Sequence, residues 1–362
     1  MNSVAFARWP ALPALRVMNL AASAALVALA CAIYLGSPYN TVQLTQLYGP
    51  PSMLFRGDHF LQAAALVYAV LLALYYLAER SPRPSKSLRF FQVAWAFLRA
   101  PAATWRQGLT SEQRLAVLAT LLKGFFGPMM VVSLMDFCMG AWVHALAILA
   151  TGGLWAHFGQ VFNRHGFWFA MQLILFVDVL VFTVGYLVES PRLGNEIRSV
   201  DPTWLGWAVA MVCYPPFNQV TVAILGSYKS EFPTYDNPTV HLVMNLLLLL
   251  LMALYASASV ALGLKASNLT YRGIVARGPY AVVRHPAYTC KNMAWWIGSA
   301  PLVAAAFGQS LWLGLQALGS VLGWTLIYTM RALTEEDHLR RVDGDYALYA
   351  QRVRYRFLPG LL

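Results

Sequence analysis

Long apolar segments alternate with short polar segments along most of the chain. An apolar run of about 20 residues is long enough to cross the hydrocarbon core of a bilayer as an α-helix. The pattern predicts about eight such helices. They cover approximately residues 17–35, 59–78, 129–150, 167–187, 204–225, 241–264, 294–307 and 311–330. We therefore expect an all-α fold, a polytopic bundle of helices in a membrane.

Proline changes this picture at two points. Gly127-Pro128 is expected to divide residues 114–150 into an interfacial or half-inserted helix and a spanning helix that begins near Met129. Pro215-Pro216 is expected to break or kink the fifth span.

Composition supports the membrane assignment and explains the basic charge. The chain has 362 residues, of which 59% are hydrophobic and 11% charged, whereas soluble domains are about a quarter charged. The net charge of +11 is accounted for by lysine and arginine retained on the cytoplasmic side of a membrane. The four cysteines are scattered without the spacing of a zinc site or a disulfide framework. We therefore expect the membrane as a partner, and neither a nucleic acid nor a metal.

The positions of the basic residues predict a topology. With the amino terminus inside, eight crossings place residues 79–113, 189–203, 265–291 and the tail after Arg331 in the cytoplasm, and these segments hold most of the lysine and arginine. Residues 79–113 also interleave aromatic with basic side chains, as in an interfacial amphipathic segment. We expect a multi-pass protein of the bacterial inner membrane with both termini cytoplasmic. It is one membrane domain, in which residues 1–239 contribute amino-terminal helices and residues 240–362 a carboxy-terminal core.

The densest polar stretch between two apolar segments runs from Lys265 to Trp296. Its centre reads Arg277-Gly278-Pro279-Tyr280 and then Arg284-His285-Pro286-Ala287-Tyr288. Each proline blocks regular helix and restricts the residue before it. An irregular loop of cations, phenols and an imidazole at a membrane surface is typical of a functional site. This central loop is the first half of the candidate site.

The tail supplies the second half. Thr334 precedes three carboxylates, Glu335, Glu336 and Asp337, at the end of the last apolar segment. One interpretation is a helix start, with Thr334 as cap and the carboxylates favoured by the helix dipole. The other is a mixed-charge pocket shared with the central loop, which suits a zwitterionic soluble cofactor meeting an apolar substrate. Downstream, a short amphipathic helix is predicted from apolar positions at helical spacing: Leu339, Val342, Tyr346 and Tyr349.

These motifs, taken in order, resemble a known family. Gly278-Pro279-Tyr280, Arg284-His285-Pro286-Ala287-Tyr288, Glu335-Glu336, Tyr349 and Arg352-Val353 are similar to the carboxy-terminal signature of the isoprenylcysteine carboxyl methyltransferase and phospholipid methyltransferase superfamily. The resemblance covers about residues 240–362. It implies an enzyme that binds S-adenosyl-L-methionine in a cytoplasmic pocket formed by the last helices, the central loop and the tail. Its acceptor would be a lipophilic or lipid-linked molecule.

The resemblance also implies roles for individual residues. Arg284, Glu335 and Arg352 would be catalytic, with Arg352 near the polar group of the acceptor. Cofactor binding would fall to a larger set: Gly278, Pro279, Tyr280, His285, Pro286, Tyr288, Glu335 and Glu336.

Two departures from the family pattern concern the acceptor side. Thr289-Cys290-Lys291-Asn292 stands where the family commonly has a glycine, and Arg354 replaces a common proline. A prenylated-protein acceptor therefore does not follow from the resemblance.

Two other classes of protein remain open. Tyr355-Arg356-Phe357-Leu358-Pro359 is similar to the tail of NADPH-dependent membrane sterol reductases, although Ala287 stands where those enzymes usually carry asparagine. A non-catalytic membrane protein or transporter is the third reading, and it predicts polar residues along the spans rather than at one face. Asp136 and Asp178 lie within apolar segments, where a carboxylate is costly. They would pair with His144, with an acceptor or with other groups of the bundle.

Overall fold

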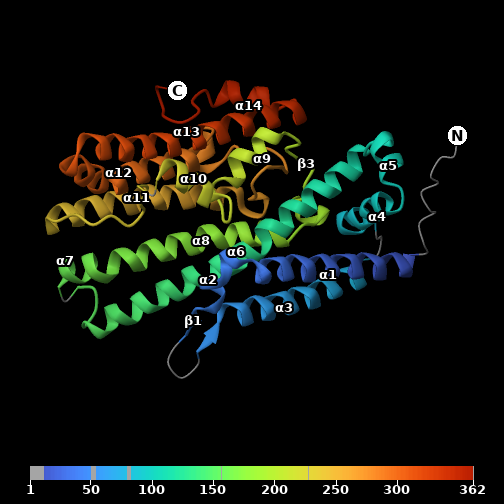
Figure 1. Ribbon diagram of the computed structural model, residues 1–362, viewed down its shortest axis with the longest axis horizontal. Coiled ribbons are helices and arrows are strands. Elements are labelled where there is room, and N and C mark those ends of the chain that lie inside the picture. The colour runs from blue at the N-terminus through green and yellow to red at the C-terminus, as the bar shows by residue number, and fades with distance from the viewer. Residues whose placement is uncertain (1–11, 50–53, 80–82, 156, 227, 362) are drawn as a thin grey trace. The chain divides into compact units, whose positions relative to one another are not determined.

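The computed structural model describes residues 12–49, 54–79, 83–155, 157–226 and 228–361, and most of them are helical (Figure 1). The chain divides into two compact units, Met1–Val132 and Ser133–Leu362. Among the described residues, six helices are long and apolar enough to cross a membrane. They are Pro13–Gly36, Gly57–Ala78, Ser111–Ala150, Phe158–Leu187, Pro238–Lys265 and Leu311–Val342. The protein is therefore a helical integral membrane protein.

The first unit pairs α1 (Leu12–Gly36) with α3 (Gly57–Ala78). Between them lie η1 (Pro38–Asn40), α2 (Thr41–Thr45) and a hairpin of β1 (Leu47–Tyr48) with β2 (Phe55–Arg56). The aromatic and basic segment forms α4 (Lys86–Arg99) and α5 (Pro101–Gln107). The Asn19 side chain donates to the carbonyl of Arg83 and accepts from the amide of Ser85, each at 2.8 Å. These bonds fasten the start of α4 to α1.

The expected division at Gly127-Pro128 is wrong, because α6 (Ser111–Ala150) is one helix of 40 residues with Pro128 inside it. Proline removes the hydrogen bond that residue 128 would donate to the carbonyl of Gly124, but the turns on either side keep theirs. In apolar membrane helices such a gap is tolerated, because neighbouring groups satisfy the freed carbonyl.

In the second unit, α8 (Phe167–Leu187) packs on α11 (Pro238–Leu262), α11 on α12 (Pro286–Gln309), and α12 on α13 (Leu311–Val342) (Figure 1). The remaining elements are short. They are α7 (Phe158–Val161), η2 (Phe162–Gly166), η3 (Pro191–Leu193), α9 (Trp204–Met211), α10 (Asn218–Leu225), η4 (Gly263–Lys265), η5 (Gly278–Ala281) and α14 (Tyr346–Arg352). Antiparallel pairing of β3 (Ser199–Val200) with β4 (Thr270–Tyr271) joins the chain after α8 to the central loop.

Two of the eight expected spans are not among the six helices. Residues 204–225 form α9 and α10, separated by a turn with a cis Pro215-Pro216 bond, so the predicted break is confirmed. The segment expected at 294–307 belongs to α12, which starts at Pro286 and includes Lys291 near its polar end.

The tail differs from both of its predicted helices. α13 continues through Thr334 to Val342, and the Thr334 hydroxyl donates to the carbonyl of Arg331 at 3.0 Å. Thr334 is therefore inside a helix, and its assignment as a helix cap is wrong. Leu339 and Val342 lie in the last turn of α13, whereas Tyr346 and Tyr349 lie in the separate helix α14. The prediction of one short helix containing all four residues is therefore also wrong. Because α13 extends unbroken beyond its apolar part, the acidic residues lie on the same continuous helix as that part.

A close backbone contact sets the position of the central loop. A Cβ atom at Gly185 on α8 would lie 1.9 Å from the carbonyl oxygen of Ala266. The buried Arg272 guanidinium donates to the carbonyls of Gly185 (2.8 Å) and Asn195 (2.9 Å). Burial lowers the pKa of Arg272, although the nearby Glu189 opposes this shift. The base of the loop is thus held against α8 by backbone carbonyls.

Candidate functional site

The central loop and the end of the tail are joined through their backbones. The amide of Arg284 donates to the carbonyl of Tyr355 at 3.0 Å, and the amide of His285 donates to that of Arg356 at 2.9 Å. The hydroxyl of Thr289 adds a bond to the carbonyl of Phe357 at 3.2 Å. Residues some 70 positions apart in sequence are therefore held side by side at the start of α12.

Glu336 lies at the centre of this junction and is only 1% exposed. Its carboxylate is 3.1 Å from Nε2 of His285 and 3.3 Å from Nε of Arg284, both in the loop. Arg340 on α13 (3.0 Å) and Arg356 in the tail (3.3 Å) complete the set. A buried carboxylate needs such partners to offset its loss of hydration. Both oxygens are occupied, so Glu336 fastens the loop to the tail and does not face the open part of the site.

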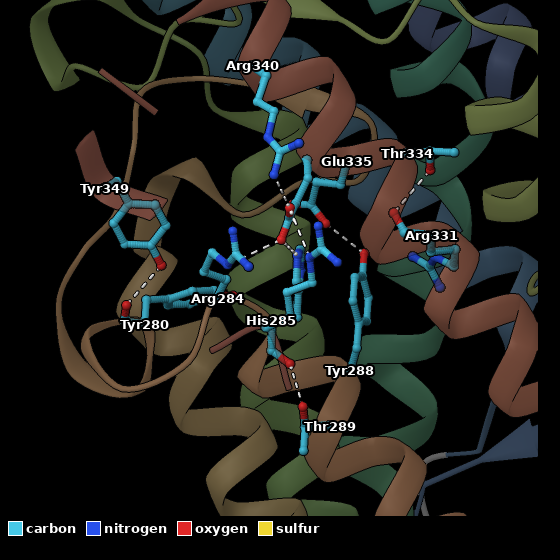
Figure 2. A network of polar contacts seen from close by, with 12 residues as sticks. Tyr280, Arg284, His285, Tyr288, Thr289, Arg331, Thr334, Glu335, Arg340 and Tyr349 are labelled. Atoms are coloured by element: carbon cyan, nitrogen blue, oxygen red, sulfur yellow. Dashed lines mark hydrogen bonds and ion pairs between the residues drawn. The ribbon is translucent and has the colours of Figure 1, made fainter. Parts of the chain in front are cut away.

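Glu335, one residue earlier, has the opposite environment. Its carboxylate is exposed, and the Tyr288 hydroxyl donates to its Oε2 at 3.0 Å (Figure 2). The Tyr288 ring stacks on the His285 ring, with centroids 5.6 Å apart. Tyr288 thus contacts both His285, a partner of the buried Glu336, and the exposed carboxylate of Glu335.

Glu335 lines a recess between the loop, α13 and α14. The recess has an empty volume of about 640 Å³, which includes its open mouth. Its wall combines cations, an anion and phenol rings: Lys265, Tyr280, Arg284, Glu335, Tyr346 and Tyr349 are among the residues that line it. The recess therefore offers both signs of charge beside aromatic surface.

Two tyrosines close one side of the recess. The Tyr349 hydroxyl donates to the carbonyl of Tyr280 at 2.9 Å, which joins α14 to η5 (Figure 2). Burial raises the pKa of Tyr349 to about 12, and burial next to Glu335 raises the pKa of Tyr280 further. Both phenols are neutral at physiological pH.

The other residues singled out in the sequence have separate places. Gly278 has a φ of 58° and starts η5, a conformation that favours glycine. Pro279 is in the first turn of η5, and Pro286 is the first residue of α12, where proline is favoured. These three shape the backbone. Arg352 ends α14 and is exposed, and within the described residues its side chain makes no hydrogen bond or ion pair.

The sequence analysis missed Arg331, which is buried one helical turn before Glu335. Its guanidinium faces the rings of Tyr288 and Tyr328 at 5.2 and 5.1 Å from their centroids. It also donates to Oδ1 of Asn268 at 3.0 Å, and the Asn268 amide donates to the hydroxyl of Tyr186 at 2.9 Å. The sequence signal was a cation inside the last apolar helix, four residues before Glu335.

Asp178 pairs within the bundle rather than with His144. Tyr255 donates to its carboxyl at 2.8 Å, and Ser259 is a second partner, both on α11. His144 stacks on Trp168 with a centroid separation of 5.8 Å. Among the described residues, no group of His, Cys, Asp and Glu side chains is arranged to hold a metal ion.

Comparison of the chain with family models, with curated proteins and with solved structures gives no match.

Proposed function

We propose that this protein is an integral membrane methyltransferase that uses S-adenosyl-L-methionine to methylate a lipophilic acceptor. The observation that carries the proposal is the exposed Glu335 carboxylate in a recess whose wall also presents Lys265 and four phenol rings. The ordered motifs of residues 278–288 and 335–353, which resemble the methyltransferase superfamily, contribute part of the wall of that recess, and residues 262–275 contribute the rest.

The groups in the recess fit the chemical groups of this cofactor. Glu335 would hold its ammonium group, and Lys265 would hold its carboxylate, each as a charge-assisted hydrogen bond. The rings of Tyr280, Tyr346 and Tyr349 offer stacking surface for a purine and electron-rich faces for a sulfonium. Glu336 and His285 would act indirectly, because their contacts hold the loop and the tail in place.

The bound cofactor supplies a methyl group on a sulfonium, which is already an activated leaving group. The protein then needs mainly to position the partners and to exclude water. Tyr288 on α12 and Arg331 on α13 contact each other beside Glu335 without lining the recess. An apolar acceptor would approach beside these two residues, and the soluble cofactor from the open mouth.

Under the positive-inside rule, the basic segments favour a cytoplasmic location for this recess. We propose that both termini are cytoplasmic and that the membrane is a bacterial inner membrane. The chain crosses the membrane eight times if α12 is one crossing and if α9, α10 and the irregular residues 228–237 together form another.

Isothermal titration of the detergent-purified protein with S-adenosylhomocysteine and with NADPH tests the proposal. S-adenosylhomocysteine is expected to bind. Glu335→Gln is expected to lower its affinity about tenfold, as for the loss of one charge-assisted hydrogen bond. Asp337→Asn is the matched control, because Asp337 is also exposed on α13 but does not line the recess. Binding of NADPH alone would favour the reductase, and binding of neither compound would favour a non-catalytic protein.

A further inference from the structure

Residues 228–237 form an irregular segment against the middle of two long helices. A Cβ atom at Gly298 on α12 would lie 1.9 Å from the carbonyl oxygen of Ser230. The Tyr235 hydroxyl donates to the carbonyl of Ile297 at 2.6 Å. Ile297 lies near the centre of α12, so the segment packs against the middle of that helix. If α12 crosses the membrane, the segment lies in the bilayer interior, where non-helical backbone persists only where protein covers it or where it lines a cavity.

The segment carries three charged side chains, Lys229, Glu231 and Asp236, and Glu231 is fully paired. Glu231 accepts from Lys291 at 2.6 Å and from the Trp295 indole N–H at 2.8 Å, both on α12. The next carboxyl, Asp178, is held by Tyr255 and Ser259. The carboxylates nearby are therefore occupied by other partners.

Lys229 is not paired in this way. Its ammonium nitrogen is 3.8 Å from the ring centroid of Trp324 on α13 and 4.6 Å from that of Trp295. Within the part of the chain that the structure describes, it makes no hydrogen bond and no ion pair. Lys229 is only partly buried, so a ligand can reach it. Cation–π contacts of this kind contribute about 2 kcal/mol or less, which does not offset the cost of a cation in a low-dielectric interior.

We propose that Lys229, between the indole rings of Trp295 and Trp324, binds the anionic headgroup of a single-chain amphiphile inside the bundle. The ligand class is an alkyl carboxylate or an alkyl phosphate monoester. Its oxygens satisfy the three N–H donors of the ammonium, next to the buried indole rings of Trp295 and Trp324.

This site is separate from the recess and does not depend on methyl transfer. Trp324 lies eleven residues before Glu335 on α13, which corresponds to about 16 Å along the helix. Rings connect the two sites, since Trp295 contacts Tyr328 at 4.6 Å and Tyr328 contacts Tyr288 at 5.6 Å between centroids.

Quenching of indole fluorescence by brominated lipids tests the site. The protein is placed in nanodiscs of phosphatidylcholine and titrated with dibromostearate, dibromostearyl phosphate or the uncharged dibromostearyl alcohol. We expect one or both anions to quench with an affinity at least about tenfold above that of the alcohol, and the better anion identifies the headgroup. Lys229→Met should remove this preference and leave the affinity for the alcohol unchanged, whereas Lys229→Arg should keep it.

Arg106→Met is the matched control, because it removes an exposed cation at the end of α5 and should leave the preference intact. Trp324→Phe should reduce the amplitude of quenching by the anion, which gives a second readout if Lys229→Met does not fold. Equal affinities for anions and alcohol in the unaltered protein would overturn the proposal. So would a preference that survives Lys229→Met, or quenching by the anion that Trp324→Phe leaves unchanged.

Discussion

Glu335 and Glu336 are adjacent on α13, yet their carboxylates lie in opposite environments. Glu335 is exposed and bonded to Tyr288, whereas Glu336 is 1% exposed and surrounded by three arginines and a histidine. Because successive helical residues are rotated by about 100°, one of the pair can face the recess while the other faces the loop. Two identical side chains, adjacent in sequence, therefore occupy two different environments.

This difference predicts that the same substitution changes the free energy of unfolding much more at Glu336 than at Glu335. Glu336→Gln should lower the free energy of unfolding by about 2–4 kcal/mol, because it leaves buried cations without their counter-charge. Glu335→Gln should change it by less than about 1 kcal/mol, since its carboxylate is exposed. Chemical denaturation monitored by circular dichroism would measure both. Equal effects of the two substitutions would show that Glu336 does not hold the central loop to the tail.

The Tyr349 hydroxyl should make stability depend on alkaline pH. Burial raises the pKa of Tyr349 from 10.0 to about 12, so the folded protein keeps this proton where the unfolded chain loses it. Its contribution is therefore complete below pH 10 and is lost as the pH rises toward 12. The melting temperature of Tyr349→Phe should be lower at pH 8, and it should fall less steeply than that of the unaltered protein between pH 10 and 12. Parallel melting curves over that range would contradict the assignment.

Arg331 and Asn268 should be energetically coupled. The guanidinium is planar and lies over tyrosine rings, a geometry that lysine does not reproduce. Arg331→Lys should destabilise the protein by about 1–3 kcal/mol. Combined with Asn268→Ala, the loss should be smaller than the sum of the two single losses by at least about 0.5 kcal/mol, because the bond between them is lost only once. Additive losses in this double-mutant cycle would argue against the contact.

Gly298 should be intolerant of a methyl group, whereas Gly308 on the same helix should accept one. A Cβ atom at Gly298 would meet the carbonyl oxygen of Ser230, while nothing lies within 4 Å of one at Gly308. We expect Gly298→Ala to cost about 1–3 kcal/mol and Gly308→Ala to be neutral or stabilising by up to about 1 kcal/mol. Thermal unfolding in detergent would measure both. If Gly298→Ala is as stable as Gly308→Ala, residues 228–237 do not pack against α12 in the way described.

Local pattern predicts part of this structure and tertiary packing determines the rest. Apolar run length identifies the helical membrane class, and Pro215-Pro216 marks a real break, because both features depend only on residues that are neighbours in sequence. Pro128 misled the prediction, since a single missing hydrogen bond does not end a long apolar helix. The motifs place both glutamates in the tail, but which one faces the recess depends on how α13 packs. Arg331 was missed because Tyr288 and Asn268 come from distant segments. Lys229 was missed because Trp295 and Trp324 do so as well.

Transfer of radiolabel tests the central claim most directly. The protein, in nanodiscs made with a bacterial lipid extract, is incubated with S-adenosylmethionine that carries tritium in its methyl group, and label is counted in the organic phase. We predict that the unaltered protein and Asp337→Asn transfer label to a lipophilic product, and that Glu335→Gln does so at least about tenfold more slowly. No transfer by the unaltered protein, or equal rates for Glu335→Gln and Asp337→Asn, would contradict a methyltransferase that binds its cofactor through Glu335.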